Sequence, residues 1–378
     1  MLNGRITIVG FGLLAGSIAM AVKQANLSVK IRAVSSKETL EKALELSLAD
    51  EFFEYESVEK WVKDSDLILL CSPIKHILKM INAIAKCGIQ VAGDKKIVVS
   101  DIGSTKEEIC KAGFALPKPF VFVGGHPMAG SEKRSVEHSD SAMFENAYWL
   151  YCMPSAENSP NNKPPEILLE LLHFLGSRAV QISPVEHDFV MSWLSHAPQL
   201  ISTSIASGLS PAVLEKHLHL AGGGFRDMTR IAGSSWGMWK DILETNRKNV
   251  STALGVYAQK ALEIKSYLSE TSHCEIQNEK NLETAFLQAN QTRHSLENGR
   301  NYAYSLYEII VQISDEPGAI LKVLQPLSEQ NINIRDIELM KVRENIGGIL
   351  VLAFKNLSDA DRAISILESR GITTKKKV

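Results

Sequence analysis

The sequence predicts an α/β protein in three parts: an α/β domain with a parallel sheet over residues 1–158, an all-helical domain over 159–300, and a small α+β domain over 303–378. Three observations predict this fold class. In the first part, short apolar runs alternate with helical patterns, which is typical of βαβ units. In the second, apolar residues recur at helical spacing, and no strand pattern appears before about residue 300. In the third, strand patterns return.

The first part is expected to place the ends of its strands at one edge of the sheet. Strands are predicted at Arg5–Val9, Val29–Val34, Leu67–Cys71, Lys96–Asp101, Phe120–Val123 and Tyr148–Met153. Helices are predicted between them at Leu13–Gln24, Glu38–Leu46, Val58–Lys63, Lys75–Cys87 and Lys106–Ala112. Ser72 and Pro73 follow a buried strand at the carboxyl edge, where ligands bind in open α/β sheets.

An exposed linker, Pro154–Pro165, is predicted to separate the first part from the helical one, because it is rich in Pro, Asn and Ser. Helices are then predicted at Ile167–Gly176, Val185–Leu209, Leu214–Leu220, Trp236–Asn246, Val250–Leu268 and Glu275–Arg293. The last of these is polar but periodic, as expected of an exposed helix or one beside a dimer contact.

The third part is predicted to have the order βαββαβ. Its elements are expected at Leu306–Ile313, Ala319–Glu329, Asn331–Lys341, Gly347–Phe354, Ser358–Arg370 and Ile372–Lys375. This order predicts a small sandwich of one sheet and two helices.

The composition is that of a globular protein, and it excludes two classes of partner. The chain has 378 residues, of which 45% are hydrophobic and 22% charged, and its formal net charge is −2. The basic block Lys375–Lys377 is too short for the clustered basic face that nucleic acid requires. The apolar run Ile8–Val22 is too short to span a bilayer. We therefore expect neither nucleic acid nor membrane as a partner.

The five cysteines are odd in number and contain no CxxC pair. They are Cys71, Cys87, Cys110, Cys152 and Cys274. This pattern argues against a disulfide framework and against a zinc site, and it is typical of a reducing compartment. We expect a cytoplasmic protein without a bound metal.

A glycine-rich loop, Gly10 to Gly16, follows the first strand and opens the first helix. Gly10 and Gly12 allow a tight turn and a close approach of the backbone to a pyrophosphate, which the helix N-terminus at Leu13 and Leu14 would bind. This strand–loop–helix context predicts a Rossmann-type dinucleotide-binding domain. The alternative is a glycine-rich turn within a core.

The choice between NAD and NADP stays open at the level of sequence. The acidic residue that binds the ribose 2′-hydroxyl of NAD is missing at the end of the second strand, where Ser35, Ser36 and Lys37 stand instead. These residues, with Arg32 nearby, are suited to the 2′-phosphate of NADP. Equally, Ser35 could cap the next helix while Lys37 lies in solvent.

Two further strand ends carry candidate catalytic residues. Ser104 follows the strand that ends at Asp101, and its hydroxyl either binds a reacting hydroxyl or caps the next helix. His126 lies just past another strand, between Gly125 and Pro127, which suggest special backbone geometry. A neutral imidazole is available as a proton acceptor near neutral pH. With a dinucleotide nearby, His126 would take the proton of a substrate hydroxyl as a hydride leaves.

The helical part supplies candidate substrate contacts. Ser195-His196 lies in the longest helical run, and three glycines beginning at Gly222 precede Arg230. Arg230 is suited to a bidentate contact with a substrate carboxylate, or to a salt bridge with Asp227 or Glu244. Trp239 is expected in a core or a pocket wall.

These motifs resemble the prephenate dehydrogenase family of tyrosine biosynthesis, in the form with a C-terminal ACT domain. The resemblance covers essentially the whole chain and is most specific at Asp101–Lys106, Gly124–Glu132, Ser195-His196 and Gly222–Arg230 with Trp239. It implies oxidative decarboxylation of prephenate to 4-hydroxyphenylpyruvate. A hydride goes to the nicotinamide, the carboxylate leaves as CO₂, and the ring becomes aromatic.

The resemblance also implies a role for each residue. His126 accepts the hydroxyl proton, Ser104 binds that hydroxyl, Arg230 holds a substrate carboxylate, and His196 and Trp239 line the pocket with Gly222. Many relatives carry a second histidine where this chain has Gln199, which leaves prephenate and arogenate as alternative substrates. The helical part is implied to form a homodimer, or a higher oligomer.

The C-terminal part resembles ACT domains, which bind amino acids at their interfaces. The residues that carry this resemblance are Asp315, Gly318, Ala319, Asn331 and Asn333, with Gly347-Gly348. It implies feedback regulation by tyrosine; the alternative is a domain kept for dimerisation. A non-catalytic amino-acid sensor on a degenerate dehydrogenase body would be expected to have lost Ser104, His126 or Arg230.

Overall fold

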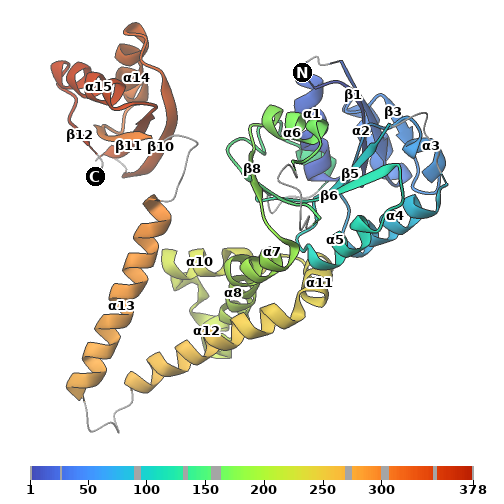
Figure 1. The fold of residues 1–378 in the computed structure, drawn as a ribbon. Helices are drawn as coiled ribbons and strands as arrows, with labels where there is room; N and C mark the ends of the chain where they lie inside the picture. Colours follow the sequence, from blue (N-terminus) through green and yellow to red (C-terminus); the bar gives the residue numbers. More distant parts are fainter. Residues whose placement is uncertain are drawn as a thin grey trace. The chain divides into compact units, whose positions relative to one another are not determined.

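The chain folds into two compact units, Met1–Asn278 and Glu279–Val378 (Figure 1). The computed structural model describes residues 2–25, 28–88, 95–130, 135–154, 163–268, 275–298, 306–343 and 347–376. The predicted linker Pro154–Pro165 lies largely outside these ranges, as do Ser131 and Glu132 of the family motif.

The first unit contains an eight-stranded sheet in the order β3-β2-β1-β4-β5-β6-β7-β8. Its strands are β1 (Gly4–Val9), β2 (Val29–Val34), β3 (Glu51–Phe53), β4 (Leu67–Leu70), β5 (Ile97–Asp101), β6 (Phe120–Pro127), β7 (Tyr148–Cys152) and β8 (Arg178–Gln181). Pairing is parallel from β3 through β6, so the Rossmann-type prediction is confirmed. The sheet reverses direction only at β7, which runs antiparallel to β6.

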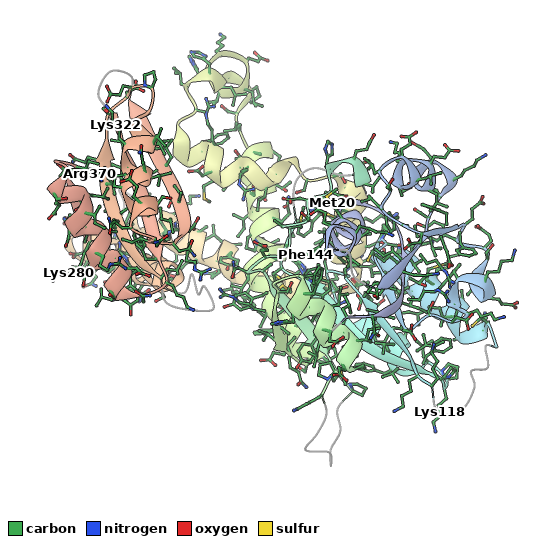
Figure 2. The ribbon with its side chains drawn as sticks, turned by 90° about the horizontal axis from the view of Figure 1, so that it is seen from above. Met20, Lys118, Phe144, Lys280, Lys322 and Arg370 are labelled. Atoms are coloured by element: carbon green, nitrogen blue, oxygen red, sulfur yellow. The ribbon has the colours of Figure 1, made fainter. Side chains whose placement is uncertain are left out.

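Helices cover both faces of this sheet (Figure 1). They are α1 (Leu13–Gln24), α2 (Lys37–Glu45), α3 (Val58–Val62), α4 (Ile74–Lys86), α5 (Glu107–Phe114) and α6 (Glu166–Phe174). One core joins α1, α2 and α6 to the sheet, and it contains the fully buried Phe144 with Met20 packed against it (Figure 2). The other core joins α3, α4 and α5 to the opposite face.

One prediction for this region is wrong. Residues 159–300 are not free of strands, because β8 pairs in parallel with β7, and α6 buries Leu168 and Leu171 in the core of the sheet. The sheet also continues past its parallel part, because β7 runs antiparallel to β6. Strands β7 and β8 extend the sheet beyond β6, the strand that carries His126. Strand β6 is therefore an interior strand, paired on both sides.

Helices make up the rest of the first unit. They are α7 (Pro184–Met191), the π-helical turn η2 (Ser192–His196), α8 (Ala197–Ser207), α9 (Pro211–Lys216), η3 (Leu218–Leu220), α10 (Gly223–Thr229), η4 (Arg230–Gly233), α11 (Trp236–Thr245) and α12 (Arg247–Tyr267). The predicted long helix at 185–209 is confirmed, with a π-helical turn at its middle. Large apolar side chains stay exposed here, among them Phe189, Leu194 and Leu262.

The second unit confirms the predicted order βαββαβ. Helix α13 (Glu275–Asn298), most of which belongs to this unit, comes first. It is followed by β9 (Tyr307–Ile313), α14 (Ala319–Glu329), β10 (Ile334–Arg343), β11 (Gly347–Phe354), α15 (Leu357–Ser369) and β12 (Thr374–Lys376). The strands form one sheet in the order β10-β11-β9-β12. Its core lies between the sheet and the two helices, on whose outer surface Lys322 and Arg370 lie (Figure 2).

Candidate functional site

The glycine loop after β1 has the geometry of a phosphate-binding turn. Gly10 has a φ of 89°, in the left-handed region, and a Cβ there would overlap the Ser72 hydroxyl. A Cβ at Gly12 would meet nothing within 4 Å, so the backbone there faces open space. Helix α1 begins at Leu13 with no side-chain cap, which leaves its first N–H groups directed at that space.

Two adjoining cavities meet at this loop and share Gly12, Cys71 and Ser135. The smaller, of about 400 Å³, lies between the loop and the end of β2 and is lined by Gly10, Ser35, Ser72 and Pro73 among others. The larger, of about 610 Å³, is lined by Leu13, Leu14, Ser104, His126 and Arg230 among others. The predicted cofactor loop and the three predicted reactive residues therefore lie on one continuous groove.

The backbone beside His126 is held by a buried ion pair. The Lys106 ammonium contacts the Asp101 carboxylate, and both side chains are fully buried. Lys106 Nζ donates to the Gly125 carbonyl at 2.7 Å, and the Gly125 N–H donates to Asp101 Oδ1 at 3.0 Å. A Cβ at Gly125 would collide with the Asp101 carbonyl, so this position requires glycine for close approach.

The structure differs from the sequence predictions at two strand ends. His126 does not follow its strand: β6 runs to Pro127, and His126 pairs with Leu150 of β7. Ser104 does not cap the next helix. Helix α5 begins at Glu107, and its N-terminus is capped by Asp188, whose carboxylate accepts the N–H groups of Lys106 at 2.6 Å and Glu107 at 2.9 Å.

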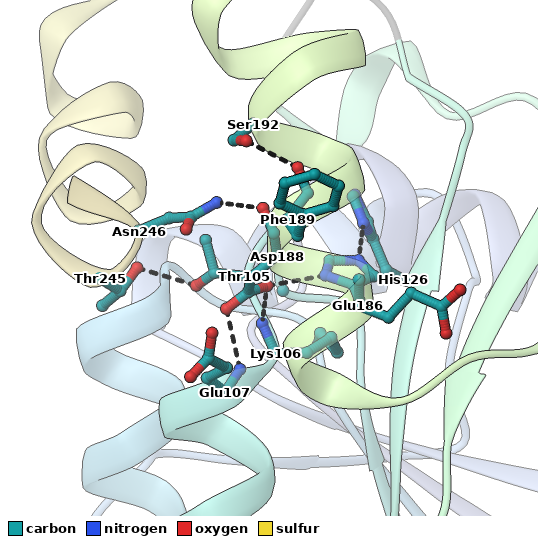
Figure 3. A network of polar contacts seen from close by, with 12 residues as sticks. Thr105, Lys106, Glu107, His126, Glu186, Asp188, Phe189, Ser192, Thr245 and Asn246 are labelled. Carbon is teal, nitrogen blue, oxygen red and sulfur yellow. Dashed lines mark hydrogen bonds and ion pairs between the residues drawn. The ribbon is translucent and has the colours of Figure 1, made fainter. Parts of the chain in front are cut away.

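A chain of hydrogen bonds runs from Asp188 to His126 (Figure 3). Asp188 Oδ1 lies 2.7 Å from His187 Nδ1, and His187 Nε2 lies 2.8 Å from His126 Nδ1. Asp188 and His187 are buried and come from α7, whereas His126 comes from β6. Asn246 of the α11–α12 junction also donates to the Asp188 carbonyl at 2.7 Å.

This chain determines which nitrogen of His126 carries a proton. The Asp188 carboxylate accepts two backbone N–H groups, so it also acts as the acceptor toward His187 Nδ1–H. His187 Nε2 is then a lone pair that accepts His126 Nδ1–H. His126 Nε2 is left as the acceptor, a tautomer assigned from the hydrogen-bond pattern.

Burial keeps His126 and His187, the two histidines of these hydrogen bonds, neutral. It lowers the pKa of His187 to about 2, so the contact with Asp188 is a hydrogen bond of a neutral imidazole and not an ion pair. Burial, His187 and the Lys106 ammonium hold the pKa of His126 well below its ordinary value of 6.5. At neutral pH, His126 is therefore a base ready to accept a proton.

Other predicted substrate residues form a second cluster beside the groove. The rings of His196 and Trp239 meet edge to face at 5.8 Å, and Asn246 Nδ2 lies 3.2 Å from His196 Nδ1. Gln199 is buried and donates to the Ile231 carbonyl at 2.9 Å, next to Arg230. The larger cavity is not lined by His196, Trp239 or Gln199, nor by Gly222, which is the N-cap of α10.

The residues after β2 match neither predicted alternative in full, although Lys37 is exposed as the second one expected. Arg32 is 5% exposed, and its guanidinium pairs with Glu51 at 2.8 Å, so it does not face the groove. Ser35 does not cap α2: the N-cap is Ser36, and the Ser35 hydroxyl instead lies 3.5 Å from the Phe11 N–H of the glycine loop. Ser36 and Lys37 are exposed and line neither cavity.

The sequence motifs do not indicate His187 and Asp188, nor the cavity residues Glu38, Lys42 and Tyr55. Adjacent titratable residues inside an apolar helical stretch were the available signal for the first pair. Glu244, one predicted partner of Arg230, is bound instead by Lys75 at 2.7 Å.

Three family models match the chain in succession. Residues 18–181 match the nucleotide-binding domain of prephenate dehydrogenase, residues 183–286 its dimerization domain, and residues 307–371 the ACT domain. Among the residues that the structure describes, no helix is long and apolar enough to cross a membrane.

Curated relatives and solved structures agree with these models. The chain is 32% identical to a prephenate dehydrogenase of Bacillus subtilis (strain 168), over 97% of this chain and 96% of the relative. It is 30% identical to that of Lactococcus lactis subsp. cremoris (strain MG1363), over 96% and 97%. A crystal structure of prephenate dehydrogenase from A. aeolicus, in complex with hydroxyphenyl propionate and NAD+, superposes with a TM-score of 0.66. It is 25% identical and covers 78% of this chain and 99% of its own.

Proposed function

Because the chain belongs to the prephenate dehydrogenase family, we propose that it catalyses the NAD(P)-dependent oxidative decarboxylation of prephenate to 4-hydroxyphenylpyruvate. The observation that carries this proposal is the groove. Ser104, His126 and Arg230 line one cavity, which shares Gly12, Cys71 and Ser135 with the cavity at the glycine loop. This arrangement supports a reaction in which a bound nicotinamide would accept a hydride, His126 a proton, and Arg230 would bind a carboxylate.

The residues present fit a dinucleotide. The backbone at Gly12 faces open space, and the N-terminus of the twelve-residue helix α1 favours a pyrophosphate. A bound nicotinamide supplies the acceptor for the hydride that leaves the hydroxyl-bearing carbon of the substrate ring. Leu13 and Leu14 would lie along it, since they line the larger cavity.

His126 acts as the general base. Its Nε2 accepts the proton of the substrate hydroxyl, so that the carbon–oxygen bond becomes a carbonyl as the hydride leaves. His126 Nδ1 stays bound to His187, which prevents the ring from rotating away. Ser104 holds the same hydroxyl by a hydrogen bond, and this orients it toward His126.

Arg230 binds a carboxylate of the substrate. Its guanidinium is always charged and presents a planar pair of donors that matches a carboxylate. Loss of the ring carboxylate as CO₂ sends its bonding electrons through the ring to the carbonyl oxygen. The ring becomes aromatic as a phenolate, which takes up a proton to give the phenol. Aromatisation supplies the driving force for this step.

Arogenate, which has an amine in place of the keto group of prephenate, is the alternative substrate. Gln199 is the observation that favours retaining arogenate as an alternative. Its amide donates to the Ile231 carbonyl, so recognition of the substrate's side chain is left to other groups. A non-catalytic, amino-acid-sensing role is the remaining alternative.

The test is the rate of reduced-nicotinamide formation by the purified protein in four mixtures: prephenate or arogenate, each with NAD or NADP. Turnover with prephenate and not with arogenate supports the proposal. Turnover with arogenate alone establishes the alternative substrate, and no turnover in any mixture overturns the enzymatic assignment in favour of a sensor.

Regulation, assembly and location complete the proposal. Tyrosine is proposed to bind the second unit near Asp315–Ala319 and Asn331–Asn333, where Gly318 has a φ of 86° and opens α14. The exposed apolar side chains of the helical region support a homodimer, and the cysteine pattern supports a cytoplasmic location. Calorimetric titration with tyrosine tests its proposed binding to the second unit. Heat of binding is expected, together with inhibition of turnover. No uptake of tyrosine would leave the domain a role in dimerisation.

A further inference from the structure

The structure offers a carboxylate where the expected acid after β2 is missing. In Rossmann-type domains the ribose of the adenosine lies beside the end of the second strand, and an acid there binds its 2′-hydroxyl. Here β2 ends at Val34, and Ser35 turns its hydroxyl to the glycine loop. Glu38, in the first turn of α2, lines the same cavity as Gly10 and Ser35.

Two described cations near the end of β2, Arg32 and Lys37, do not line this cavity. Arg32 is buried in its pair with Glu51 and donates to the carbonyls of Trp61 at 2.6 Å and Lys63 at 2.9 Å. Lys37 is exposed and does not line the cavity. Among the described residues that line it, Lys42 is the sole cation.

Lys42 is itself placed between two carboxylates. Its Nζ lies 3.3 Å from Glu137 Oε2 and 3.8 Å from Glu38 Oε1. Glu137 is held in turn by the Ser135 hydroxyl at 2.8 Å, and these two contacts lower the pKa of its carboxyl. Glu38, Glu137 and Lys42 together carry a net charge of −1, which repels a 2′-phosphate of charge about −1.5 to −2.

We propose that Glu38 accepts the hydrogen bond of the adenosine ribose 2′-hydroxyl and selects NAD over NADP, while Glu137 keeps Lys42 from serving as a phosphate ligand. This inference rests on the proposed function for its cofactor class. It assigns a specificity-determining residue outside the position where the Rossmann pattern places one.

The experiment measures the dissociation constants of NAD+ and NADP+ by calorimetry, without prephenate, for the full chain and three variants. The wild-type protein is expected to bind NAD+ at least tenfold more tightly than NADP+. In Glu38→Gln the preference falls by roughly 10- to 100-fold, the range that corresponds to one hydrogen bond to a charged group.

Glu41→Gln is the matched control, because Glu41 is exposed on the same helix and does not line the cavity. It removes the same charge and is expected to leave the preference unchanged. Lys42→Met tests the opposite assignment: NADP+ affinity is expected to stay weak, whereas a loss of strong NADP+ binding would identify Lys42 as a phosphate ligand.

Two results overturn the proposal: a wild-type protein that prefers NADP+, or a Glu38→Gln variant that keeps the wild-type preference. Because binding is measured without substrate, a protein that selects NAD+ through Glu38 but turns over neither prephenate nor arogenate would contradict the proposed function and leave this inference standing.

Discussion

The two ends of the groove are built in different ways. At the glycine loop the cavity is shaped by backbone, with Gly10 and Gly12 leaving room and side chains of the exposed helix α2 at its rim. At the other end His126 is held by the hydrogen-bonded pair His187 and Asp188 of α7, and the neighbouring Gly125 backbone by Lys106, the N-cap of α5. A backbone site depends on the absence of side chains, whereas the His126 site depends on a continuous chain of partners.

The largest effect is expected at the reacting end. Replacing His126 by Asn removes the proton acceptor, and kcat with prephenate is expected to fall about 1,000-fold, within the range for general-base catalysis. The affinity for NAD+ is expected to remain, because the glycine loop is untouched. Steady-state kinetics with a parallel NAD+ titration measures both. A variant with near-normal kcat would remove His126 from the chemistry.

The next effect tests the chain behind His126. Asp188→Asn is expected to lower kcat by about 10- to 100-fold, because an amide can present an N–H to His187 Nδ1 and reverse the tautomers of both imidazoles. The variant also weakens the cap of α5, so its melting temperature must be recorded.

A purely structural role for Asp188 would lower stability without changing the pH profile of kcat/KM. The tautomer assignment instead requires a changed profile at a temperature where the variant is fully folded. Asn249→Ala is a matched control, because Asn249 lies near Asn246 but outside the chain of imidazoles; its kcat is expected to be that of the wild type.

Smaller effects are expected at the backbone end, and they separate folding from binding. Gly10→Ala should lower stability by about 1–2 kcal/mol through its left-handed φ alone, and weaken NAD+ binding by at least about tenfold. Gly12→Ala should weaken NAD+ binding without loss of stability, since its Cβ would occupy open space. Urea unfolding and NAD+ titration of both variants distinguish the two cases. Equal stability losses would contradict the assigned geometry.

The smallest change is expected in the dependence of kcat/KM on pH, which should be nearly flat. Because the pKa of His126 is held well below 6.5, its neutral form persists as pH falls from 8 to 6.5, and kcat/KM should change less than about twofold over that window. An acid limb centred at or above pH 6.5 would contradict this.

Protein stability should respond over the lower pH range. Burial lowers the folded-state pKa of His126 and His187, and lowers that of His196 to about 4. Below pH 6.5 the unfolded chain therefore binds more protons, and each histidine removes at most about 1.4 kcal/mol of stability per pH unit. Urea unfolding at several pH values measures the slope, and a constant stability would argue against buried neutral imidazoles.

Much of the fold could be predicted from sequence because the signals are local. The glycine loop, the strand ends at Ser72 and Ser104, and the order of the second unit follow from periodicity and turn residues within short windows. Strand β3 has only three residues, and β8 is an edge strand with mostly exposed side chains, so neither shows a strong pattern. The reversal at β7 depends on pairing, which a single strand does not encode.

The site was predictable only as far as its residues follow strand ends. The strand-end pattern indicated Ser104 and His126, although His126 lies within the end of β6, and the glycine context indicated Arg230. All three line the larger cavity. His187 and Asp188 are far from His126 in the sequence, and they act only because α7 packs against β6 and α5. The role of Lys106, likewise, depends on the backbone of Gly125 lying beside Asp101.

We propose that the groove joining the glycine loop to His126 oxidises and decarboxylates prephenate. The most direct measurement follows reduced nicotinamide, CO₂ and 4-hydroxyphenylpyruvate together in one reaction of the purified protein with prephenate and NAD. The three products are expected in equal amounts, at a rate that Asn249→Ala retains and His126→Asn loses. Reduced nicotinamide without CO₂, or no reaction in a protein that binds NAD+, would contradict the account.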